Sequence, residues 1–173
     1  MKNMEIKRCK WANASKELAE YHDNEYGFRI TDDILYFERL TLEIFQAGLS
    51  WATILKKRTA FRKAFDNFDF YKIAKYNEKK IESLLLDSTI IRNKKKIEAT
   101  VYNAGVFITI TNENKSFDAF LNKQPIDNRE ELLKIFKKHF KFMGILILEE
   151  FMMSVGLWPV KHEKECFLYK EHS

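Results

Sequence analysis

The stretch Glu43-Ile44-Phe45-Gln46-Ala47-Gly48-Leu49-Ser50-Trp51 lies at the centre of the segment that decides the fold, residues 32–58. Apolar residues recur at helical spacing on both sides of Gly48, which predicts two amphipathic helices joined by a tight turn. Gly48 stands where a helix end favours a left-handed residue, and Ser50 is a suitable N-cap for the second helix. Glu43 is the anomaly, because it places a carboxylate on an otherwise apolar helix face eight residues before Trp51.

The composition predicts one globular domain over residues 1–173. Hydrophobic residues make up 46% of the chain and aromatic residues 14%, which suffices for a buried core and excludes a disordered chain. The net charge of +5 favours an anionic partner. Residues 1–7 lack the apolar run of a signal peptide, and no stretch has membrane length, so we expect a cytoplasmic protein without membrane association.

Helical periodicity along the remaining chain predicts an all-α fold of about nine helices. The most apolar helix, from Gly144 to Val155, is expected to be buried. Short polar residues precede the amphipathic runs and are candidate N-caps: Asn13 or Ser15, Asp69, Asn77, Ser116 and Asn128.

Both cysteines and two histidines have a spacing that suits a metal site. Cys9 and His22 lie near the start, and His162 and Cys166 lie four residues apart near the end, where a helical turn would place both on one side. Two thiolates and two imidazoles form a closed structural zinc site, which would join the two ends of the chain. Buried apolar cysteines and core histidines are the alternative, and the residues alone leave both interpretations open.

A basic turn near residues 87–96 separates two helical patterns. We expect Ile90 and Ile91 to face the core and residues 92–96 to face solvent. Helix N-terminal amides and basic side chains bind phosphate groups, so a nucleic-acid contact is one interpretation and a solvated turn is the other. The basic residues at 56–58 and 137–138 are interpreted as solvated.

Trp11, Tyr21, Trp51 and Glu43 form a second candidate group. Each alone is more typical of a core. A buried glutamate must be paired, hydrogen-bonded or protonated, and a planar cation held between aromatic faces would satisfy all four residues.

The sequence resembles the DNA-3-methyladenine glycosylase I family over nearly its whole length. The resemblance implies a helix-hairpin-helix DNA glycosylase fold in which one structural zinc per chain, held by Cys9, His22, His162 and Cys166, joins the two termini. The segments that carry it are Tyr21-His22-Asp23-Asn24-Glu25-Tyr26-Gly27, Phe45-Gln46-Ala47-Gly48-Leu49-Ser50-Trp51, Ile54-Leu55-Lys56-Lys57-Arg58, Ile90-Ile91-Arg92-Asn93 and Lys141-Phe142-Met143-Gly144.

The resemblance also implies an activity: base-excision repair, in which a monofunctional glycosylase flips 3-methyladenine out of alkylated double-stranded DNA and hydrolyses its N-glycosidic bond. Trp11, Tyr21 and Trp51 would hold the flipped base, and Glu43 would read its edge as the catalytic residue. Leu49 would fill the gap in the duplex. The DNA-gripping hairpin would use Ile91, Arg92, Asn93 and Lys94. We expect a bacterial-type monomer, associated with the nucleoid through DNA.

Methylated adenine carries a positive charge that already weakens its glycosidic bond. We therefore expect Glu43 to act by hydrogen bonding and electrostatics, with water as the nucleophile. The related glycosylases use an aspartate after the hairpin, which the family lacks, and this chain offers only Glu98 there.

The chain departs from the family pattern at several positions. Tyr26 replaces a tryptophan, and Thr89 replaces a glycine, where a left-handed turn would be costly. Glu149 and Met153-Ser154 replace an aromatic residue and Gln-Ala. One extra residue precedes His162, and Val160-Lys161 replaces Asn-Asp. The range of bases that the pocket accepts therefore stays open.

Two other functions fit parts of the sequence. A non-catalytic DNA-binding protein on the same zinc-stapled helical fold is disfavoured by the presence of Glu43, Trp51 and Tyr21 together. An all-α interaction module without nucleic acid is disfavoured by the basic turn.

Overall fold

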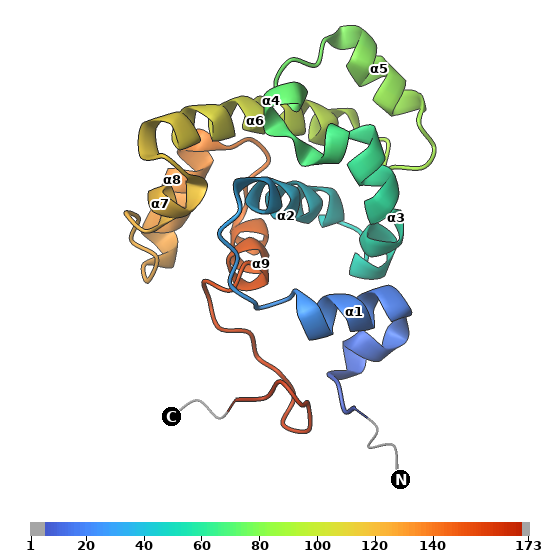
Figure 1. Cartoon of the computed structure of the whole chain (residues 1–173), viewed down its shortest axis with the longest axis vertical. Helices are drawn as coiled ribbons and strands as arrows, with labels where there is room; N and C mark the ends of the chain where they lie inside the picture. The colour runs from blue at the N-terminus through green and yellow to red at the C-terminus, as the bar shows by residue number, and fades with distance from the viewer. Residues whose placement is uncertain (1–5, 171–173) are drawn as a thin grey trace.

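The computed structural model describes residues 6–170, which contain nine α-helices and two short 3-10 helices; no strand occurs within that range. The predicted all-α class is therefore confirmed. Residues 1–5 and 171–173 of the predicted domain lie outside the described part (Figure 1). The elements in chain order are η1 (Lys10–Ala14), α1 (Lys16–Asn24), α2 (Asp33–Gln46), α3 (Trp51–Ala64), η2 (Asp66–Phe68), α4 (Phe70–Ile73), α5 (Glu78–Leu86), α6 (Lys94–Asn114), α7 (Phe117–Leu121), α8 (Arg129–His139) and α9 (Ile145–Ser154).

Polar side chains cap the N-termini of these helices at positions that the sequence predicts. Ser15, rather than Asn13, accepts a hydrogen bond from the backbone N–H of Leu18 at 3.2 Å. Such a cap satisfies a backbone donor that has no partner within the helix, so it fixes where the helix starts. The other four predicted caps act in the same way: Asp69, Asn77, Ser116 and Asn128.

Helix α2 is the central element of the fold. Figure 1 shows it between α6 and α9, with α3 following it across a tight turn. Every residue from Tyr36 to Phe45 is buried, so this helix packs on all sides. Aromatic side chains surround it; Phe37, for example, packs edge-on against Phe107 of α6 with ring centroids 5.0 Å apart. Its buried charged residues are Glu38, Arg39 and Glu43.

The turn between α2 and α3 has the predicted geometry. Gly48 adopts a left-handed conformation with φ +85°, which a side chain would disfavour. Gln46 donates from Nε2 to the Leu49 carbonyl at 2.7 Å, and Ser50 caps α3 by accepting from the Thr53 N–H at 3.2 Å. These bonds leave the Leu49 side chain 38% exposed at the tip of the turn.

Helices α5 and α6 form the expected hairpin around residues 87–93. Ile90 is buried and residues 92–95 are exposed, as predicted. Thr89 has no positive φ, because Asp87 accepts from its backbone N–H at 2.9 Å and stabilises the turn without a left-handed residue. The expected strain at Thr89 is therefore absent.

Lys96 was expected to face solvent, and this prediction is wrong. Its side chain is buried and donates from Nζ to the Phe45 carbonyl at 2.9 Å and to the Ala47 carbonyl at 2.6 Å. Carbonyls at the end of α2 have no hydrogen-bond donors inside that helix, so a lysine from α6 donates to them. The lysine therefore ties the α5–α6 hairpin to the turn that carries Leu49.

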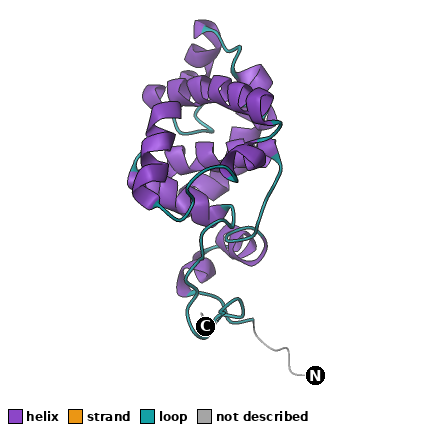
Figure 2. Cartoon of the chain, turned by 90° about the vertical axis from the view of Figure 1, so that its left-hand side faces the viewer, coloured by secondary structure: helices purple, strands orange, loops and turns teal. Residues whose placement is uncertain are grey.

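As far as Lys170, the segment after α9 contains no helix and runs beside η1 and α1 (Figures 1 and 2). The Phe167 N–H donates to the Lys7 carbonyl at 2.9 Å, and the Lys10 N–H donates to Glu163 Oε1 at 2.8 Å. Segments from opposite ends of the sequence therefore meet. None of the helices in residues 6–170 has the length and hydropathy needed to cross a membrane.

Candidate functional site

Cys9, His22, His162 and Cys166 form one compact cluster where these terminal segments meet. Their ligand atoms all lie within 4.8 Å of one another. Cys9 Sγ is 3.4 Å from His162 Nδ1, and Cys166 Sγ is 3.4 Å from His22 Nε2. Four soft or borderline donors at such spacing can hold a metal ion.

The surroundings of the cluster orient its donors. His22 donates from Nδ1 to Asp23 at 2.9 Å, which leaves Nε2 free to face the cluster. Backbone N–H groups of Glu163 and Leu168 donate to the two sulfur atoms at 3.3 and 3.4 Å. His162 and Cys166 face the same cluster, as their four-residue spacing predicts, although turns rather than a helix connect them.

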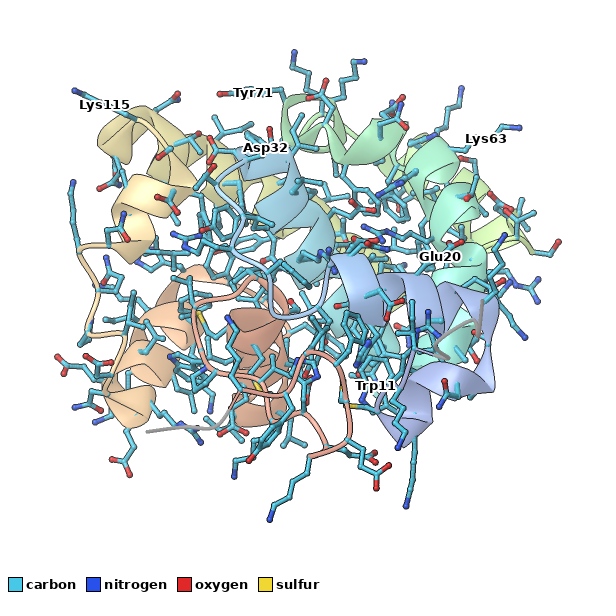
Figure 3. The ribbon with its side chains drawn as sticks, turned by 60° about the horizontal axis from the view of Figure 1, so that its bottom comes forward. Trp11, Glu20, Asp32, Lys63, Tyr71 and Lys115 are labelled. Carbon is cyan, nitrogen blue, oxygen red and sulfur yellow. The ribbon has the colours of Figure 1, made fainter. Side chains whose placement is uncertain are left out.

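An aromatic cavity of about 100 Å³ lies beside this cluster. Its lining comes from η1, α1, the loop after α1, α3 and α9, and consists of Trp11, Tyr21, Tyr26, Trp51 and Glu150. Figure 3 labels Trp11 where the N-terminal helices approach the C-terminal segment.

The aromatic rings of the cavity contact one another directly. Tyr21 and Trp51 stack with ring centroids 5.4 Å apart and planes inclined by 22°. Trp11 packs edge-on against Tyr26 at 5.7 Å and against His22 at 5.2 Å. The second contact joins the aromatic cavity to the Cys/His cluster, because His22 belongs to the cluster.

Glu43 is not among the residues that line the cavity; it lies deeper, with 1% of its surface exposed. Burial raises the pKa of the Glu43 carboxyl well above its ordinary value, the Glu150 carboxylate raises it further, and the Arg39 guanidinium counteracts both. These surroundings therefore favour the neutral acid more strongly than water does.

Buried polar atoms without a hydrogen-bond partner are concentrated around Glu43 and Tyr21. Within residues 6–170, the buried side-chain atoms without a hydrogen-bond partner are Glu43 Oε1, the Tyr21 hydroxyl, and Nε and Nη1 of Arg39. The Arg39 guanidinium lies over the Tyr21 ring, 4.8 Å from its centroid. Buried polar groups nearly always have partners, so this concentration makes the region a candidate binding site.

Arg39 belongs to a partly buried ion-pair network that the sequence did not reveal. It pairs with Glu25, which also pairs with Arg58 at 2.8 Å. Arg58 pairs in turn with Glu38 at 2.8 Å, and Arg62 with Glu38 at 2.7 Å. The prediction that Arg58 is solvated is therefore wrong: α3 directs its guanidinium against α2.

Four of the five residues expected to contact DNA are exposed on the surface around the hairpin, and Ile91 is half-buried. Arg92 and Lys94 are exposed, and Leu49 is exposed on the neighbouring turn. Ile91 instead packs against the core, and the Asn93 side chain caps α6 by accepting from the Lys96 N–H at 3.1 Å.

Sequence reasoning missed Glu150 and Arg39, and singled out Glu149 instead. Glu149 pairs with Arg129 at 2.8 Å and, with Met153, lines a neighbouring hollow that shares Trp11 and Tyr26 with the aromatic cavity. Glu150, one residue later, lines the aromatic cavity. The two adjacent acids on α9, Glu149 and Glu150, were the only sequence signal for an acid in the cavity. Helical periodicity alone does not tell which of two adjacent residues faces a cavity.

Comparison with known proteins identifies the family. Residues 11–135 match the methyladenine glycosylase family model, which is well over half of the chain. DNA-3-methyladenine glycosylase 1 of Escherichia coli is 36% identical over 171 residues, covering 88% of this chain and 91% of that protein.

Solved structures agree with this assignment. A crystal structure of 3-methyladenine DNA glycosylase I has a TM-score of 0.85 and 36% identity, covering 95% of this chain and 100% of that one. A tyrosine-to-phenylalanine variant of 3-methyladenine DNA glycosylase I, in complex with 3-methyladenine, has a TM-score of 0.84 and 29% identity, covering 96% and 99%. The predicted DNA glycosylase fold is therefore confirmed, and the chain belongs to the methyladenine glycosylase family.

Proposed function

We propose that this protein is a DNA-3-methyladenine glycosylase, which hydrolyses the N-glycosidic bond of 3-methyladenine in alkylated double-stranded DNA. The observation that carries the proposal is the set of unpaired buried atoms on Glu43, Tyr21 and Arg39 behind an aromatic cavity. The relative of known structure that holds 3-methyladenine supports the identity of the base.

Trp11, Tyr21 and Trp51 bind the flipped base by stacking. Tyr21 and Trp51 are in direct contact, so the base enters by stacking on the outer face of this pair or by parting the two rings. An alkylated purine cation gains from stacking and from the attraction between its charge and the aromatic faces.

Glu43 then favours a positively charged base over a neutral one. In the nucleotide, methylation at the ring nitrogen makes the adenine cationic, and its release as a neutral base needs no protonation. The positive base favours the ionised form of Glu43, whereas a neutral base leaves a buried acid without a partner. Water attacks the anomeric carbon as the glycosidic bond breaks.

The surface near the cavity provides the contacts to the duplex. Leu49 projects from the α2–α3 turn and fills the gap that the flipped base leaves. Arg92, Lys94 and the first amides of α6 contact phosphate groups of the backbone. In this proposal, Ile91 and Asn93 hold the shape of the hairpin through packing and capping.

Zinc is the metal that suits the cluster best, because two cysteine thiolates and two imidazoles form a closed tetrahedral set. Held by four protein ligands, a zinc ion would stabilise the fold and would not activate water. Cys9 N-terminally flanks η1, which carries Trp11, so the site also positions one wall of the cavity.

Elemental analysis tests this metal proposal. The wild-type protein is expected to carry one zinc per chain, and Cys9→Ser should lose it; a full metal content in that variant would refute the assignment.

A direct assay tests the activity: purified protein is incubated with methylated duplex DNA, and the released bases are separated and quantified. We expect free 3-methyladenine from methylated DNA and no base from unmethylated DNA. DNA binding without release would instead favour the non-catalytic DNA-binding alternative. We also propose that residues 1–173 form one domain that acts as a monomer on nucleoid DNA, which gel filtration of the protein with and without duplex tests in part.

A further inference from the structure

Glu150 is an acid in the aromatic cavity that the proposed mechanism does not use. It projects from α9 into the lining formed by Trp11, Tyr21, Tyr26 and Trp51. Its Oε2 accepts a hydrogen bond from the Tyr26 hydroxyl at 3.2 Å, and Tyr26 is itself part of the lining. A carboxylate in a space bounded mostly by aromatic rings is unusual and calls for a positively charged neighbour.

No basic side chain supplies that neighbour in the described chain. Within residues 6–170, Glu150 has no ion pair, and the Tyr26 hydroxyl is its sole hydrogen-bond donor. The preceding residue, Glu149, differs in this respect because Arg129 neutralises it at 2.8 Å. Two adjacent acids on one helix therefore have opposite environments, one compensated by the protein and one left for a ligand.

We propose that Glu150 is a specificity-determining residue, whose carboxylate faces the bound base and makes this cavity selective for N-alkylated purine cations beyond the selectivity that Glu43 provides. The inference rests on the proposed function, since it concerns the same cavity. Its ligand class is a planar purine with a fixed positive charge, and neutral purines of the same shape are disfavoured.

A purely structural role for Glu150 is the competing explanation, in which the acid only orients the Tyr26 hydroxyl. Tyr26→Phe separates the two roles, because it removes the hydrogen bond and leaves the negative charge in place. Glu149→Gln is a matched control, because it makes the same change in charge and volume on the same helix at an acid paired with Arg129.

Small-molecule binding provides the test. The probes are 3,9-dimethyladeninium, a fixed cation with a methyl group in place of the sugar, and neutral 9-methyladenine. Quenching of tryptophan fluorescence reports binding, because Trp11 and Trp51 line the cavity. Thermal unfolding of each variant confirms that it is folded.

We expect Glu150→Gln to reduce the preference for the cation over the neutral probe about tenfold, the size of one charge-assisted contact. The neutral probe should bind as before, and Tyr26→Phe and Glu149→Gln should keep most of the wild-type preference. An unchanged preference in Glu150→Gln would overturn the inference, and so would an equal weakening of both probes by Glu150→Gln and Tyr26→Phe.

The excision assay separates this inference from the proposed function. If the wild-type protein releases no 3-methyladenine but Glu150 still determines cation preference, the glycosylase proposal fails and the cation site stands. If release occurs and Glu150→Gln keeps the full preference, only the inference fails.

Discussion

Two buried glutamates on the same helix have opposite surroundings. Glu38 and Glu43 both lie in α2, with 2% and 1% of their surfaces exposed. Glu38 accepts hydrogen bonds from Arg58 and Arg62, the shortest at 2.8 and 2.7 Å. Glu43 Oε1 has no partner within the described chain.

The pKa values of the two carboxyls reflect this difference. Burial by itself would raise the pKa of Glu38, but the hydrogen bonds from Arg58 and Arg62 more than offset it and hold that pKa below its usual range. The pKa of Glu43 is raised well above its usual range by burial and by Glu150. A buried acid that the protein pairs is structural, whereas one that it leaves unpaired indicates a ligand.

The largest expected effect on stability is at the paired acid. Glu38→Gln should lower the free energy of unfolding at neutral pH by about 3 kcal/mol, because it removes the buried carboxylate that pairs with both Arg58 and Arg62 and leaves the largely buried Arg58 with Glu25 alone. Urea unfolding measures this loss. A cost near zero would show that Arg58 and Arg62 do not depend on Glu38, and the contrast between the two acids would disappear.

The unpaired acid should respond to pH in the opposite direction. Because the pKa of Glu43 is raised on folding, the folded protein keeps a proton that the unfolded chain loses, and stability falls as pH rises from the unfolded pKa towards the folded one. Glu43→Gln removes this penalty, so the variant should be more stable than the wild type by a margin that grows with pH.

For Glu38, whose pKa is lowered, the stabilisation is present above the unfolded pKa and is lost as pH falls through the folded one. Urea unfolding of Glu38→Gln and Glu43→Gln from about pH 4 to about pH 8 distinguishes these two opposite dependences of stability on pH. The same sign for both variants would contradict the assignment.

Arg39 belongs to the ion-pair network of Glu38 and also influences the pKa of Glu43. Its replacement should have the smallest effect on the free energy of unfolding. Arg39→Met should cost about 1 kcal/mol in urea unfolding, the contribution of one hydrogen bond, because Glu25 keeps its contacts with Arg58. The loss should also raise the pKa of Glu43 further, since Arg39 favours its ionised form. A loss as large as that of Glu38→Gln would place Arg39 among the structural ion pairs.

The sequence predicts features that depend on neighbouring residues. The caps Ser15, Ser50 and Asn77 follow from a polar residue before an amphipathic run, and the left-handed Gly48 follows from its place at a helix end. Glu43 is noticeable in the sequence because an acid interrupts an apolar face.

Features that depend on distant partners escape prediction. Glu38 interrupts the same helix, but its partners come from α3, so the sequence cannot tell the paired acid from the unpaired one. Lys96 belongs to a basic run in the sequence, and only the fold places the carbonyls at the end of α2 beside it. Glu150 differs from Glu149 only in the direction it takes from α9.

The most direct test of the contrast measures excision by Glu43→Gln and Glu38→Gln side by side, with rates corrected for the folded fraction. We predict that Glu43→Gln lowers kcat/KM for release of 3-methyladenine from methylated duplex DNA by about 100-fold or more, as loss of a preorganised electrostatic contact does. Folded Glu38→Gln should retain most of the wild-type rate. Wild-type activity in Glu43→Gln, or an equal loss in both variants, would contradict the claim that the unpaired acid serves the ligand.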